Sequence, residues 1–238
     1  MTASPRDIKA SSWEDYLEIF YAPSRVFERR GSKFGGPLLV LVIVSAVVIL
    51  GTYSLLSPLF EAEGQRAMAE QMKELTAEQR AQAEEMSGKF AWLAPVTLIV
   101  ITAIAPLVLG IVLWLVGKML GAVQALGAAI MVAAFSYFPR ILAWPLLALQ
   151  AAMLPEDNVK SFASISFSPA RFVDPAATSY EMIMLLMRFD IFVLWTTFLL
   201  ALGLKVTGKI STEKAVIAGV VMWLLGTLQP LIAYLRAG

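Results

Sequence analysis

The sequence contains neither cysteine nor histidine among its 238 residues. Without cysteine the chain can form no disulfide, no thiol nucleophile and no cysteine metal site. Without histidine it lacks the most common general base and the most common metal ligand. We therefore expect no enzymatic activity, no catalytic residue, no metal and no cofactor.

Charged residues are also scarce. They make up 16% of the chain, and hydrophobic residues make up 58%. A soluble domain has about 25% charged and about 45–50% apolar residues. The formal net charge of +1 provides no broad basic surface, so we expect no nucleic-acid partner. The composition is typical of an integral membrane protein, whose first partner is the lipid bilayer.

Long apolar runs occur five times, and each is long enough for a helix of about 20 residues to cross a bilayer core of about 30 Å. The sequence therefore predicts an all-α, polytopic membrane protein with five transmembrane helices. Residues 1–36 would form a cytoplasmic tail with interfacial helices, and residues 37–235 the membrane domain. The predicted spans are about 37–60, 91–117, 125–154, 181–204 and 215–235.

The segment before the first span has acidic residues where a signal peptide would have an apolar core, so we expect no cleavable signal. Trp13, Tyr16, Leu17 and Phe20 recur at helical spacing and predict a short helix. Pro23 suits the first turn of a second one. Aromatic residues beside a basic cluster favour a helix lying in the membrane interface. Packing against the rest of the protein is the alternative.

A polar insert follows the first span. Residues 61–89 contain seven glutamates and four basic residues. Thr76 and Gln79 have the spacing of a capping box, which predicts that a second helix begins there. We expect residues 61–90 to form an extracytoplasmic helical hairpin with a solvated surface and no chemistry of its own.

The distribution of Lys and Arg predicts the orientation. The side that holds the N-terminus carries 10 of them and the other side carries 7, and the cluster just before the first span has the greatest weight. We expect a cytoplasmic N-terminus and an extracytoplasmic C-terminus. Each basic residue near an anionic membrane surface contributes about 1 kcal/mol of attraction, although ordinary positive-inside bias explains them equally. The candidate interface cluster is Arg25, Arg29, Arg30, Lys33, Lys205 and Lys209.

Two charges fall inside apolar runs, Arg140 in the third predicted span and Asp190 in the fourth. An ionisable residue within a bilayer is costly and marks a candidate functional site. Arg140 would lie about 22 Å from the inner end of its helix and Asp190 about 15 Å. We therefore predict an intramembrane ion pair of Arg140 and Asp190, with either a structural or a functional role. Arg188 is the competing partner, but on a helix it would point away from Asp190.

Five segments carry a resemblance to a known family: Ala22–Phe27, Gly127–Pro139, Arg188–Trp195, Leu199–Lys205 and Ser211–Ala215. They resemble the Yip domain family of Ypt/Rab-interacting membrane proteins, in its bacterial branch. The similarity extends from Tyr16 to Leu235. It implies a five-helix protein of the bacterial inner membrane with a cytosolic N-terminus and no catalytic residue. Eukaryotic members act in vesicle trafficking with Rab-type GTPases, and the long cytosolic N-terminal domain usual in them is not seen in this sequence.

We therefore predict a non-enzymatic membrane scaffold, adaptor or membrane-organising protein, with membrane-protein partners or a second copy of itself. The alternative is a small transporter or lipid-handling channel that uses Arg140 and Asp190 in a cavity between bent helices. A water-accessible cavity that reaches Arg140 would favour the alternative. Enclosure of Arg140 by Trp144, Phe192 and Trp195 would favour the scaffold.

Overall fold

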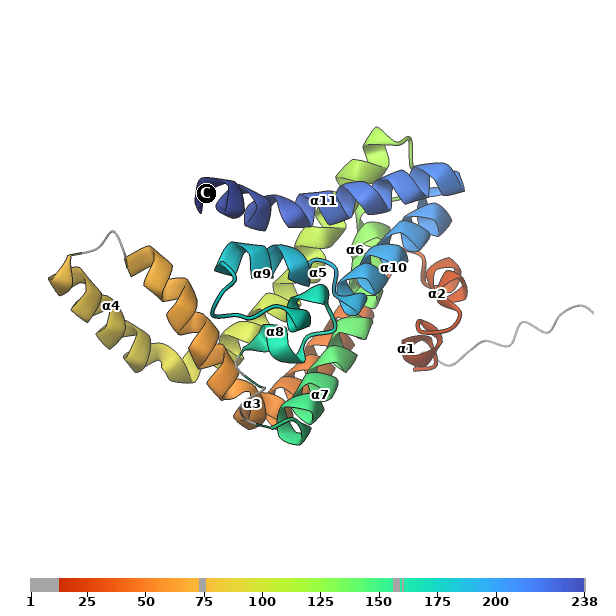
Figure 1. Ribbon diagram of the computed structural model, residues 1–238. Helices are drawn as coiled ribbons and strands as arrows, with labels where there is room; N and C mark the ends of the chain where they lie inside the picture. The colour runs from red at the N-terminus through yellow and green to blue at the C-terminus, as the bar shows by residue number, and fades with distance from the viewer. Residues whose placement is uncertain (1–12, 73–75, 156–158, 160, 238) are drawn as a thin grey trace, which may run out of the picture.

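The computed structural model describes residues 13–72, 76–155, 159 and 161–237, and these residues are all-helical (Figure 1). Within these described ranges, two short helices precede the membrane domain, and three further short helices lie between its third and fourth spans. In chain order the helices are α1 (Asp15–Glu18), α2 (Pro23–Arg30), α3 (Gly35–Met72), α4 (Ala77–Phe90), η1 (Ala91–Leu93), α5 (Ala94–Met119), α6 (Leu126–Ser136), α7 (Phe138–Met153), α8 (Phe162–Ile165), η3 (Pro169–Phe172), α9 (Tyr180–Met187), α10 (Ile191–Gly208) and α11 (Thr212–Ala237).

Five helical segments are long and apolar enough to cross a membrane, as predicted. The third of them is central: 67% of its most apolar window is buried, compared with 17% for the first and the second. The first two therefore present most of their surface outward, and the third forms the axis of the bundle. The spans are Gly35–Gly64, Ala94–Met119, Leu126–Met153, Ile191–Gly208 and Thr212–Arg236.

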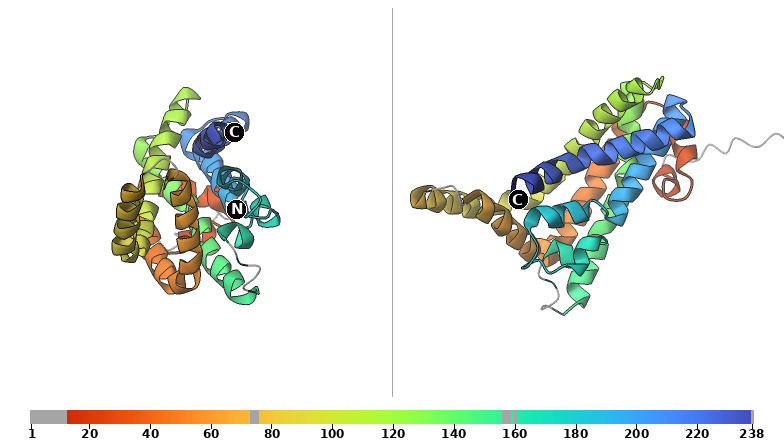
Figure 2. Two further views of the ribbon diagram at one scale, coloured as in Figure 1. Left: turned by 60° about the vertical axis from the view of Figure 1, so that its left-hand side comes forward. Right: turned by 45° about the horizontal axis from the view of Figure 1, so that its top comes forward.

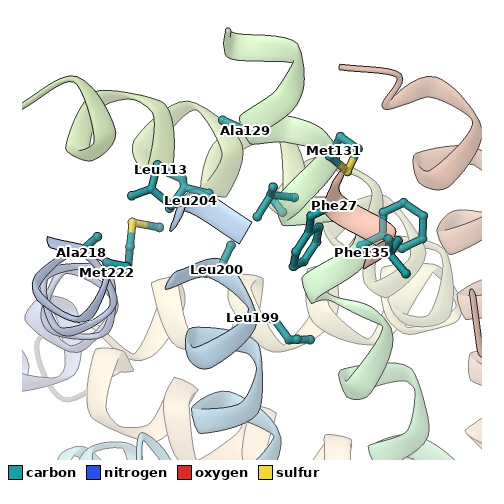
Figure 3. Packing of buried hydrophobic residues seen from close by; sticks show 14 of the residues in the cluster. Phe27, Leu113, Ala129, Met131, Phe135, Leu199, Leu200, Leu204, Ala218 and Met222 are labelled. Atoms are coloured by element: carbon teal, nitrogen blue, oxygen red, sulfur yellow. The ribbon is translucent and has the colours of Figure 1, made fainter. Parts of the chain in front are cut away.

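Small residues set the close packing around α6. A Cβ at Gly110 of α5 would lie only 2.6 Å from the Cα of Ile130, and a Cβ at Gly203 of α10 would overlap the side chain of Val132. Both glycines are needed because helix α6 passes within backbone contact distance of its two neighbours. Figure 3 shows how leucines of α5 and α10 and residues of α6 meet in this core, with Phe27 of α2 among them.

The third span is not the single helix that the apolar run predicts. Helix α6 ends at Ser136, and α7 begins at Phe138, with Pro139 in its first turn. Proline has no N–H to donate to the preceding turn and its ring excludes the carbonyl four residues earlier. It is tolerated at the start of a helix, so the chain restarts at this point.

The fourth predicted span is also divided. Helix α9 ends at Met187, a turn follows, and α10 begins at Ile191 with Asp190 as its N-cap. The carboxylate of Asp190 accepts the backbone N–H of Phe192 at 2.9 Å. An aspartate competes with the helical hydrogen bonds in this way and so favours helix starts. Asp190 is therefore a helix cap and not a residue within a continuous helix.

The polar insert forms an arm that projects from the bundle. Helix α3 has 38 residues, a length of about 57 Å, which exceeds the bilayer core of about 30 Å. Its last turns continue beyond the other spans, and α4 runs back beside them (Figures 1 and 2). The predicted capping box is confirmed, because Gln79 accepts the N–H of Thr76 at 3.0 Å and Thr76 accepts that of Gln79 at 3.4 Å.

Candidate functional site

The N-terminal helices pack against the membrane domain. The ring of Tyr16 stacks on Phe135 with centroids 5.6 Å apart and lies 5.3 Å from Phe138, at the break between α6 and α7. The ring of Phe20 meets Trp195 of α10 edge-on at 5.7 Å. This is the protein-packed arrangement that the sequence left open as the alternative to a helix resting in the interface.

An ionic network holds these two short helices together. Asp15 is 2% exposed and Glu18 is 8% exposed. Arg29 pairs with both carboxylates and Arg30 pairs with Asp15. The hydrogen bond to Glu18 raises the pKa of Arg29, and the interaction with Asp15 adds to this effect, while partial burial opposes it. Arg25 lies 3.9 Å from Glu18 at the edge of the network.

The six residues of the candidate interface cluster therefore differ in whether their charge is available to bind lipid headgroups. Arg29 and Arg30 are neutralised within the protein. Lys33, Lys205 and Lys209 are exposed. Because paired charges attract a charged surface less than free ones, the three lysines are the better candidates for contact with anionic lipid.

The segments predicted to be cytoplasmic lie at one end of the molecule. The N–H of Val123, after α5, donates to the carbonyl of Gly208 at the end of α10, at 3.1 Å. A Cβ on Gly127 would lie 3.1 Å from the carbonyl oxygen of Ser32, after α2. The loop that carries Lys209 is thus beside the chain that leads into the first span.

A cavity of about 920 Å³ lies in the other half of the bundle, between α3, α7, α9, α10 and α11. Most of its lining is apolar and rich in phenylalanine and methionine, and it also includes Trp144. Cavities of this size with a few polar groups are the usual form of ligand sites. The charged and phenolic side chains that line it are Glu63, Arg140, Tyr180, Glu181, Arg188 and Asp190.

Both predicted intramembrane charges line this cavity, but Asp190 does not pair with Arg140 among the contacts of the described residues. One carboxylate oxygen of Asp190 accepts the N–H of Phe192, and the other accepts the N–H of Phe167 at 3.1 Å. Backbone donors thus satisfy the carboxylate at a helix start, so the predicted ion pair is corrected to a cap that also fixes a loop.

Arg140 lies in the cavity without a carboxylate partner among the described contacts. It is an exposed residue, and its guanidinium lies 5.3 Å from the centre of the Tyr137 ring. Such a cation–π contact contributes about 0.5–2 kcal/mol. Trp144 and Phe192 line the same cavity without closing over Arg140, and Trp195 faces Phe20 instead.

Arg188 is a further functional candidate, although the sequence predicts that it points away from Asp190. Its Nε donates to Thr227 at 3.2 Å, and a terminal nitrogen donates to the carbonyl of Trp223 at 3.4 Å. The indole of Trp223 donates in return to the carbonyl of Arg188 at 2.9 Å. The signal in the sequence is Asp190 itself: an aspartate followed by an apolar run marks a helix start. Arg188, at the end of α9, and Asp190, at the start of α10, therefore do not lie on one continuous helix.

The fold and the cavity define a multi-pass α-helical membrane protein with two arginines facing a largely apolar space within the bundle. The sequence profile of the Yip1 domain matches residues 17–233, nearly the whole chain, so the protein belongs to the Yip1 domain family. Members of this family are generally non-enzymatic membrane proteins. Searches of curated proteins and of solved structures found no significant match to the chain.

Proposed function

We propose that this protein is a membrane scaffold or adaptor of the bacterial inner membrane, with its N-terminus in the cytoplasm and its C-terminus outside. The observation that carries the proposal is the arm formed by the end of α3 and by α4, which projects from the bundle (Figure 2). A protein that only had to span the bilayer would need no such extension.

The described side chains of α4 face outward from the protein. Those that the structure describes are exposed, apart from half-buried Ala83, and none belongs to a hydrophobic cluster. Lys89 pairs with Glu85 along the helix at 2.7 Å, and an exposed pair of this kind contributes only about 0.3–0.5 kcal/mol. The helix therefore adds little to the core and offers its surface to other molecules.

Partners of two kinds fit this proposal. The exposed apolar faces of α3, α5 and α11 suit lipid, neighbouring membrane proteins or a second copy of the chain. Lys33, Lys205 and Lys209 suit the headgroups of anionic lipids at the cytoplasmic face. The family relationship supports membrane-protein interactions in general.

Site-specific photo-crosslinking in native membranes tests the scaffold. A photoreactive residue is placed at Gln82 or Met86 on α4, and at Val100 on α5 as a control that is equally exposed but lies within a span. We expect one or a few discrete protein adducts from the α4 positions and mainly lipid adducts from Val100. Only lipid or no adducts at Gln82 and Met86 would contradict the proposal, and an adduct at twice the protein mass would identify a homo-oligomer.

A second candidate, a small transporter or lipid-handling channel, is favoured by one observation: the cavity reaches Arg140. Since the native chain has no cysteine, single-cysteine labelling can test its access to water. Ala143 lines the cavity, Ala129 is fully buried and Val108 faces outward from a span. We expect a water-soluble maleimide to label Ala143→Cys much faster than Ala129→Cys or Val108→Cys, and equal rates would exclude this candidate.

A further inference from the structure

Arg140 and Arg188 approach the same cavity from different helices. Arg140 comes from α7 and Arg188 from the turn after α9, and both line the space. The two guanidinium groups thus share one space of about 920 Å³. Like charges held together at low dielectric are unfavourable unless a counter-charge joins them, so the pair favours an anion between them.

The carboxylate of Asp190, which lines the cavity, has other contacts in the described part of the chain. Asp190 uses one oxygen for the N–H of Phe167 and the other for the N–H of Phe192. Burial raises the pKa of the Tyr180 phenol, which also lines the cavity, and the charges of Glu63 and Glu181 add to this effect. Asp190 makes no ion pair with either arginine among the described contacts.

The two guanidiniums keep donors for a further ligand. Among the described residues, Arg140 has the cation–π contact with Tyr137, and Arg188 has its hydrogen bonds to Thr227 and Trp223. A guanidinium carries five N–H donors, so these contacts leave several N–H groups on each side chain that can meet an anion.

The two arginines lie within the thickness of the membrane domain. Arg140 is near the middle of the span Leu126–Met153, and Arg188 is bonded to Thr227, within the span Thr212–Arg236. A small ion from water would have to leave its hydration shell to reach this depth, which is costly. An amphiphile brings apolar groups that match the rest of the cavity, where Trp144, Phe162 and Met184 provide aromatic and flexible apolar surface.

We propose that this cavity binds a phospholipid, with its phosphate between Arg140 and Arg188 and part of its acyl chains against the apolar wall. Arginine donates two parallel hydrogen bonds to a phosphate, and the volume of about 920 Å³ accommodates a headgroup with the first part of its chains. The proposal goes beyond the scaffold function and does not depend on the arm.

Lipid titration of the purified, delipidated protein in detergent tests the site. Phosphatidylglycerol, a diacylglycerol with the same chains, and inorganic phosphate are added separately, and binding is measured by native mass spectrometry and by the shift in melting temperature. We expect saturable binding of one phosphatidylglycerol and at least tenfold weaker binding of the diacylglycerol. Arg140→Gln should weaken the binding of phosphatidylglycerol by about tenfold or more, since it removes charge-assisted hydrogen bonds.

The matched control is Arg171→Gln, which removes the same charge from η3. Arg171 donates to Gln150 at 3.0 Å and does not line the cavity, so the affinity should be unchanged. Arg140→Lys keeps the charge and guards against misfolding of the glutamine variant, and an intermediate affinity is expected. Equal affinity in wild type and Arg140→Gln, or equal binding of diacylglycerol, would overturn the proposal, and so would stoichiometric binding of inorganic phosphate with no preference for the lipid.

Discussion

The second carboxylate oxygen of Asp190 accepts the backbone N–H of Phe167 at 3.1 Å, across 23 residues of chain. The bond joins the start of α10 to the loop between α8 and η3, and the N–H of Ile191 donates to the carbonyl of Phe167 at 3.3 Å beside it. One side chain thus starts a transmembrane helix and holds the loop that forms one wall of the cavity.

Replacing Asp190 with alanine should destabilise the protein by about 1–3 kcal/mol, because it removes a helix cap and leaves a second N–H without its acceptor. Asp190→Asn keeps one acceptor oxygen and should cost less than the alanine change. Chemical denaturation in a mild detergent, followed by circular dichroism, measures the free energy of unfolding. Equal losses in the two variants would show that the hydrogen bonds are not the source of the effect.

The same residue gives a second prediction through its relation to Arg140. If Arg140 and Asp190 formed a buried ion pair, Arg140→Leu would recover part of the stability lost in Asp190→Asn. Removing both charges leaves no unpaired charge buried, whereas removing one does. The contacts of Asp190 are with backbone N–H groups instead, so we expect the two changes to be additive within about 0.5 kcal/mol. If the double variant is clearly more stable than the sum of the two single losses predicts, the result would support an ion pair between Arg140 and Asp190.

The sequence predicted what depends on composition and run length. Five apolar segments gave five spans, and the spacing of Thr76 and Gln79 gave a helix start that the hydrogen bonds confirm. These features are local, since bilayer thickness and the unpaired N–H groups of a helix end dictate them.

The site was harder to predict because it depends on breaks within apolar runs. Hydropathy does not distinguish a continuous helix from two helices joined at Tyr137 or at Asp190. Depth estimates that assumed continuous helices placed Arg140 beside Asp190 and turned Arg188 away. Because the helix breaks at Asp190, its carboxylate binds backbone N–H groups and not Arg140. Arg188 is directed toward α11 and also lines the cavity.

The contact between Gly203 and Val132 predicts a packing defect on substitution. Gly203→Ala would place a methyl group against the Val132 side chain, and overpacking of this kind costs about 1–3 kcal/mol. Gly51→Ala in α3 is the matched control, since nothing lies within 4 Å of the position that its new methyl group would take. We expect a lower melting temperature for Gly203→Ala only, and equal melting temperatures would contradict close contact between α6 and α10.

Lys209 has a left-handed backbone with φ of 54° at the end of α10. A residue with a Cβ is disfavoured there by about 1–2 kcal/mol, whereas glycine is not. Lys209→Gly should therefore maintain or raise the melting temperature. Lys205→Gly, within the same helix, should lower it, because glycine in a helix interior costs about 1 kcal/mol. Destabilisation by Lys209→Gly would mean that the lysine side chain makes a contact that outweighs the backbone strain.

The pairing of Asp15 with Arg29 and Arg30 predicts that the N-terminal helices can be loosened without unfolding the bundle. Asp15→Asn leaves both arginines facing a neutral amide in a partly buried site, and loss of a hydrogen bond to a charged group costs about 1.5–3 kcal/mol. We expect faster tryptic cleavage after Arg29 and Arg30 and faster hydrogen exchange in α1 and α2. Glu28→Gln removes the same charge from an exposed position and should leave both rates unchanged. If both variants are cleaved at the wild-type rate, aromatic packing of Tyr16 and Phe20, and not the ionic network, holds this unit in place.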